Sequence, residues 1–139
     1  MNKIAVLLLV LTAAIWFPYT ALAQQNALDI LTVNAASRLE KCNIMSFEAS
    51  LSKEDRLTAD EAQQRFDLAD GCIATAKKDI NPEYQAALAL VKNHPKSVAS
   101  LNTYYTYWSS AIQHCSSKRE LSTSKQKLEQ LRERLYSGR

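Results

Sequence analysis

Residues 59–80 read ADEAQQRFDLADGCIATAKKDI, and this stretch decides the fold class. Its apolar residues recur at alternating steps of three and four, which is the spacing of one face of an α-helix. Thr58 and Glu61 form the T-x-x-E pattern of a helix N-terminal capping box. We therefore predict a helix from Ala59 to Ile80 that packs closely along its alanine-rich face: Ala59, Ala62, Phe66, Ala69, Ile73, Ala76 and Ile80.

The stretches on either side of this helix are also helical in pattern. A preceding helix is expected from about Ala27 to Leu51. Asn81-Pro82 is expected to end the helix over 59–80 and to start a short helix that reaches Asn93. Asn is a good N-terminal cap, and Pro suits the first helical turn. His94-Pro95 marks the next break. The buried face of the helix over 27–51 is predicted to consist of Leu28, Leu31, Ala35, Leu39, Cys42, Met45 and Ala49.

The last helical stretch begins near Ser97 and meets no Gly or Pro before Gly138. Its first apolar row fails at Arg119 and Ser122, where a row of leucines replaces it. One helix over 97–136 would be roughly 60 Å long, which is more than the preceding helices can cover. Either the chain bends near Ser116-Ser117, or the last twenty residues project and their leucines need a partner, for example a second copy. The two rows are Val98, Leu101, Tyr105, Trp108, Ile112 and Cys115, and then Leu121, Leu128, Leu131 and Leu135.

Composition supports an all-α fold, because the 139 residues include only two Gly and three Pro for turns. We predict a small antiparallel four-helix bundle with a long C-terminal helix. The expected division is a signal peptide over 1–23, a helical bundle domain over 24–117 and a basic C-terminal helical extension of the same domain over 118–139. The extension carries seven Lys and Arg against three Glu, whereas residues 24–117 carry nine against eleven acidic residues.

The N-terminus has the pattern of a cleavable secretory signal peptide. Lys3 supplies the positive charge, and Ile4 to Phe17 form an apolar run that Pro18 ends. Ala21-Leu22-Ala23 places small residues at the two positions that signal peptidase reads, so we expect cleavage before Gln24. The run is shorter than the roughly 20 apolar residues of a membrane-spanning helix. We therefore expect a protein secreted across the inner membrane, most simply to the periplasm, and not an integral membrane protein after cleavage.

Export to an oxidising compartment makes the three cysteines candidates for a disulfide. Cys42 and Cys72 lie equally far from residue 57, near the expected turn, so antiparallel helices would place them at the same height. Bridged Cα atoms must lie within about 7 Å of each other. Cys115 lies roughly 30 Å along the last helix and fits such a pair less well. We predict a Cys42–Cys72 disulfide, with Cys115 buried as a free thiol or joining two chains.

No catalytic, metal or cofactor motif is present. His114 adjoins Cys115, but neighbouring helical residues point about 100° apart and do not form a thiol–imidazole pair. His94 lies in a turn, and no H-x-x-x-H, C-x-x-C or Gly-rich phosphate loop occurs. Glutamates interrupt the basic steps of residues 118–139, which argues against a nucleic-acid partner. We therefore expect no cofactor, no metal, no nucleic acid and no enzymatic activity.

An aromatic cluster, Tyr104-Tyr105-Thr106-Tyr107-Trp108, is too wide for one helix face to bury completely. Tyr and Trp are common in binding hot spots. The first functional hypothesis is therefore an adaptor, accessory or immunity-type protein. It would bind another envelope protein through these aromatics or through the basic tail. A homodimer through the C-terminal helix is a further hypothesis. The candidate partner-binding residues are Tyr104, Tyr107, Trp108, Leu128, Leu131 and Leu135.

Two alternative functions stay open. Leu57 and Thr58 match the start of the L-T-x-x-Q repeat of small periplasmic helical chaperones, although Glu61 stands in place of the Gln and no second copy occurs. This partial resemblance implies a chaperone-like protein that shields unfolded clients. The second alternative is an enzyme without a recognisable motif.

Overall fold

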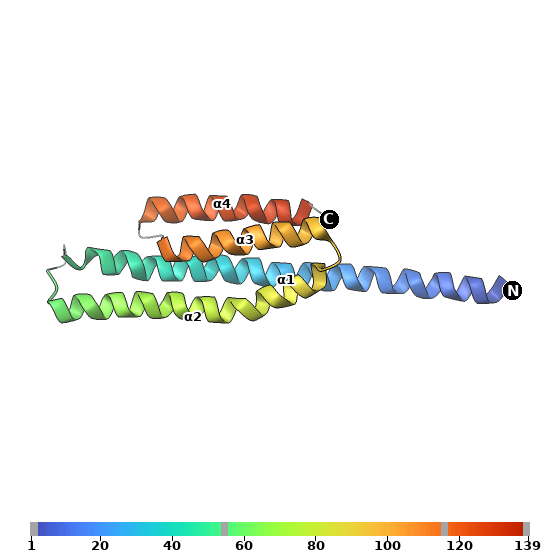
Figure 1. Ribbon diagram of the computed structural model, residues 1–139, viewed down its shortest axis with the longest axis horizontal. Coiled ribbons are helices and arrows are strands. Elements are labelled where there is room, and N and C mark those ends of the chain that lie inside the picture. The colour runs from blue at the N-terminus through green and yellow to red at the C-terminus, as the bar shows by residue number, and fades with distance from the viewer. Residues whose placement is uncertain (1–2, 54–55, 115–116, 138–139) are drawn as a thin grey trace.

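The computed structural model describes residues 3–53, 56–114 and 117–137, which form four α-helices and no strand. The helices are α1 (Lys3–Ser50), α2 (Ala59–Val91), α3 (Pro95–His114) and α4 (Lys118–Ser137), and a 3-10 turn, η1 (Leu51–Lys53), follows α1. Successive helices run antiparallel, and the first part of α1 extends beyond the bundle (Figure 1). The predicted all-α four-helix bundle is confirmed.

The helices α1 and α3 form the centre of the bundle. Each packs against the other three helices, whereas α2 and α4 lie on opposite sides of this central pair and do not contact each other over the described residues. The largest side chains buried in the core are Trp108, Tyr104, Leu28, Leu31, Leu39, Ile80, Leu101, Ile112 and Leu135.

The first helix is longer than the sequence pattern predicted. The structure begins α1 at Lys3 rather than near Ala27, and the helix runs through Pro18. Residues 20–27 contain no Gly or Pro that would interrupt it before Ala27. Cleavage after Ala23 stays a prediction. Among the described residues, no helix has an apolar stretch long enough to cross a membrane.

The predicted capping box at the start of α2 is confirmed. The Glu61 backbone N–H donates to the Thr58 hydroxyl at 3.3 Å, and the Thr58 backbone N–H donates to the Glu61 carboxylate at 2.9 Å. The Thr58 hydroxyl also donates to this carboxylate, at 2.7 Å, and the two bonds that the carboxylate accepts from Thr58 lower the pKa of the Glu61 carboxyl.

The predicted break at Asn81-Pro82 is wrong, because α2 runs without interruption through Pro82. Proline removes one backbone N–H and crowds the carbonyl four residues earlier, which bends a helix if packing holds both halves. Both halves are held here, since Ile80 is buried before the proline and Ala87 and Val91 are buried after it. Figure 1 shows α2 changing direction along this part of its length.

The predicted helix over 97–136 is divided into α3 and α4, so the alternative with a bend near Ser116-Ser117 is the one that the structure contains. Ser117 begins α4 by accepting a hydrogen bond from the Glu120 backbone N–H at 3.2 Å. The chain then folds back, and α4 packs along α3 and α1 (Figure 1). Residues 118–137 therefore belong to the bundle and do not project from it.

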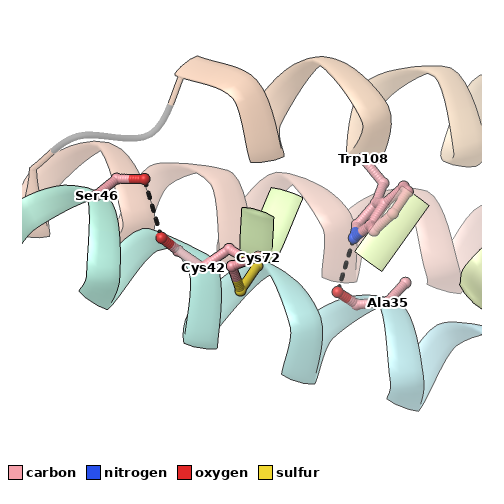
Figure 2. Close-up of a disulfide and its surroundings, with 5 residues drawn as sticks. All are labelled: Ala35, Cys42, Ser46, Cys72 and Trp108. Atoms are coloured by element: carbon pink, nitrogen blue, oxygen red, sulfur yellow. Dashed lines mark hydrogen bonds between the residues drawn. A yellow bond between two sulfur atoms is a disulfide. The ribbon is translucent and has the colours of Figure 1, made fainter. Parts of the chain in front are cut away.

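The buried face of α3 is shifted from the row that the sequence predicted, since it includes Tyr104 in place of Tyr105. Tyr104 and Trp108 are buried, whereas Tyr105 and Val98 are half-buried. The Trp108 indole N–H donates to the Ala35 carbonyl at 2.7 Å (Figure 2). Tyr105 stacks on Tyr84, with 4.0 Å between the ring centroids. The shift follows from packing, because α3 contacts three helices and its buried face is set by all of them.

The predicted disulfide is confirmed, since Cys42 of α1 and Cys72 of α2 are bonded with their Cα atoms 5.5 Å apart (Figure 2). The pairing follows from the antiparallel hairpin, which brings the two cysteines to the same level. Cys115, which was predicted to be buried or to join two chains, lies outside the described residues.

Candidate functional site

The candidate site is a hollow of about 260 Å3 between α1 and α4. Tyr104 and Leu128, two of the predicted binding residues, are buried side chains that line it. Val33 of α1 also lines the hollow, yet 59% of this side chain is exposed to solvent. The complete lining is Thr32, Val33, Ala36, Tyr104, Lys125, Leu128, Glu129 and Arg132.

Packing of the neighbouring helices holds the apolar lining in place. The Tyr104 hydroxyl donates to the Thr32 carbonyl at 3.3 Å, which connects α3 to α1 beneath the hollow. Burial raises the pKa of the Tyr104 hydroxyl. Leu31, Thr32 and Ala35 occupy the buried face of α1, so Val33 points away from the core. Ile30, one turn before Val33, is 49% exposed and continues this outer face.

Charged side chains of α4 lie around the hollow. Lys125 Nζ pairs with the Glu40 carboxylate at 3.0 Å, and Arg132 pairs with Glu129 at 3.2 Å. Both pairs are solvent-exposed, so they contribute little to stability and can exchange partners. The result is an apolar surface bordered by two cations and one carboxylate.

A second hollow, of about 430 Å3, adjoins the first and shares Glu129 and Arg132 with it. It is also lined by Asp29 and Tyr136, whose hydroxyl donates to the Asp29 carboxylate. The Arg132 guanidinium lies 5.6 Å from the centre of the Tyr136 ring. Burial, together with the bond to Asp29, raises the pKa of the Tyr136 hydroxyl. These contacts attach the C-terminal end of α4 to α1 and extend the charged surface along their junction.

The lining of the hollow combines an apolar surface with charged groups at its border. An apolar side chain of a ligand could enter the hollow over Tyr104 and Leu128, while Lys125 and Arg132 attract acidic groups beside it. Within the described residues, no group of three His, Cys, Asp or Glu side chains is placed to hold a metal ion.

A second surface lies on the α1–α2 hairpin. A groove of about 410 Å3 runs beside the disulfide, and all of its lining residues come from α1 and α2. They are Arg38, Lys41, Cys42, Met45, Asp67, Leu68, Gly71, Cys72, Thr75, Ala76 and Asp79. Leu68 is 55% exposed. A Cβ atom at Gly71 would meet no atom within 4 Å other than the nearby backbone of its own helix. A glycine inside a helix costs about 1 kcal/mol relative to alanine, and packing within this chain does not require one here.

The other predicted binding residues lie elsewhere. Trp108, Leu131 and Leu135 are buried in the core. The leucine row of α4 therefore packs against its own chain, which leaves the predicted homodimer through this helix without its contact residues. Tyr107 is half-buried and lines a separate hollow between α3 and α4 with His114 and Arg119.

No protein-family model matches the chain, and no similar protein was found among the curated proteins or the solved structures.

The sequence interpretation missed Val33 and Ile30. Both are large aliphatic residues outside the predicted buried face of residues 27–51. This mismatch was the feature of the sequence that could have indicated an exposed apolar surface. All large hydrophobic side chains found exposed among the described residues lie on α1 or α2, and none lies on α3 or α4: Leu22, Ile30, Val33, Ile44, Phe66, Leu68 and Leu90.

Proposed function

We propose that this protein is an exported binding protein, an adaptor or inhibitor that holds a segment of another envelope protein against the junction of α1 and α4. The observation that carries the proposal is Val33, which lies exposed beside a hollow lined by buried Tyr104 and Leu128. A partner that covers Val33 and places an apolar side chain in the hollow would remove all of this apolar surface from water.

The charges around the hollow favour a partner segment with acidic residues next to its apolar anchor. Lys125 and Arg132 come from the basic α4, and their present carboxylate partners are solvent-exposed. Cations at the rim of an interface mainly accelerate association and select the partner. We expect Lys125→Glu to slow association and to reduce its dependence on salt.

Replacement of Val33 by aspartate tests the proposal. We expect Val33→Asp to weaken binding of the stoichiometric partner captured from an envelope extract at least tenfold, because it places a charge where an apolar contact is buried. Both titration calorimetry and surface plasmon resonance measure this change. Val33 is exposed, so the free energy of unfolding should change by no more than about 0.5 kcal/mol.

Gln85→Asp is the matched control, since Gln85 is an exposed residue of α2, which does not contact α4 over the described residues. It should leave the affinity unchanged. Equal effects of the two substitutions would contradict the assignment of the hollow. Capture of many weakly held proteins in place of one would support the chaperone-like alternative.

Export is the second part of the proposal, and it is supported by the charged, apolar and small-residue segments of the leader and by the Cys42–Cys72 disulfide. We expect mass spectrometry of the protein isolated from cells to find an N-terminus at Gln24. A chain that retains residues 1–23 would contradict cleavage.

A further inference from the structure

We propose that the groove beside the Cys42–Cys72 disulfide is the contact surface of a homodimer. The proposal is independent of partner binding at the α1–α4 hollow, because no residue lines both the groove and the hollow.

The groove is an uncovered apolar face of the bundle. Its floor is formed by the disulfide and Ala76, and Met45 and Leu68 lie along its sides. Neither α3 nor α4 contributes a residue to it. Gly71 leaves open space in the α2 wall, so the backbone of another helix could approach α2 closely at this position.

The two walls of the groove carry opposite charges. On the α1 wall, Arg38 already pairs with Glu83 of α2 at 3.2 Å, so the exposed Lys41 gives this wall its positive charge. Asp67 and Asp79 give the α2 wall its negative charge. A surface with one basic and one acidic wall is complementary to a copy of itself only if α1 of one copy lies over α2 of the other. A two-fold axis along the groove produces this arrangement. An axis across the groove would instead place the basic walls together.

The apolar residues satisfy the same symmetry. Cys42 and Cys72 are at the same level of the hairpin because they are bonded. Met45 and Leu68 lie three and four residues from the bridge toward the same end, so they are also level. With the axis along the groove, Met45 of each copy faces Leu68 of the other, and Gly71 of each copy faces the α1 backbone of the other near Cys42. The second copy is thus an occupant that the apolar residues fit level by level and that the two walls fit in the sign of their charge.

Light scattering after size-exclusion chromatography tests the dimer with the oxidised protein as isolated from cells. We expect about twice the mass of one chain. Leu68→Asp should weaken dimerisation at least tenfold, because it puts a charge into the apolar part of the groove. Val33→Asp, the same kind of change at an equally exposed aliphatic residue, should leave the dimer intact.

These two variants separate the two proposals. Leu68→Asp should keep the affinity for the partner protein, and Val33→Asp should lose it. A single-chain mass for the wild-type protein at every attainable concentration would overturn the dimer, and so would a dimer that Leu68→Asp leaves unchanged.

A charge exchange tests the direction of the symmetry axis. Lys41→Glu and the double variant Asp67→Lys with Asp79→Lys should each dimerise poorly alone, because each gives two walls of the same sign. Mixed together, they should form a heterodimer, because acidic and basic walls face each other again. A mixture in which both variants stay monomeric, or homodimers of either variant as tight as wild type, would overturn the proposed arrangement.

Discussion

Replacing Trp108 with alanine is expected to lower the free energy of unfolding by about 3–5 kcal/mol, the usual cost of removing a fully buried large aromatic side chain. Trp108 is the largest of the fully buried side chains, and it connects α3 to α1 through its hydrogen bond to the Ala35 carbonyl. A domain of this size has a total stability of only about 5–15 kcal/mol, so the loss is a large fraction of it. Urea unfolding followed by far-UV circular dichroism measures the change.

Two further variants show whether the burial of Trp108 is the cause. Trp108→Phe keeps a ring but loses the N–H donor, and it should cost about 1–2 kcal/mol. Tyr107→Ala removes a neighbouring aromatic that is only half-buried, and it should cost clearly less than Trp108→Ala. Equal losses for Tyr107→Ala and Trp108→Ala would show that α3 does not face the core as described.

Removing the disulfide, by replacing both Cys42 and Cys72 with alanine, is expected to lower the free energy of unfolding by about 3–4 kcal/mol. The bridge closes a loop between residues 30 positions apart, which restricts the unfolded chain in the entropy model. Urea unfolding with and without a reducing agent measures the effect.

The reducing agent also provides the control for this prediction. It should destabilise the wild-type protein by about the same amount as the double substitution, and it should leave the double variant unchanged. A wild-type protein whose unfolding midpoint is the same in both conditions would contradict a stabilising Cys42–Cys72 bond.

Much of the fold could be predicted because helical periodicity and the positions of the turns constrain it strongly. The three- and four-residue spacing predicted helices in each part of the chain, and the turn near Thr58 placed Cys42 beside Cys72. The loss of the apolar row at Arg119 and Ser122 already marked the region where α3 gives way to α4. Local signals of this kind are reliable when the residues that produce them are near in sequence.

The remaining features depend on tertiary packing. Pro82 resembles a helix start in sequence, but burial of Ile80 and Val91 on its two sides keeps α2 continuous. Phe66 fits the predicted buried row, yet it is 48% exposed. Val33 becomes part of a site only because α4 folds back beside α1. None of these outcomes can be read from spacing along one helix.

The most direct test of the proposed function is photocrosslinking in living cells with a benzophenone amino acid at position 33. We expect one discrete covalent adduct with a single envelope protein, and no adduct from the same probe at Gln85, an exposed residue of α2 away from the junction of α1 and α4. Either no adduct from position 33 or the same set of adducts from both positions would contradict binding at the junction of α1 and α4.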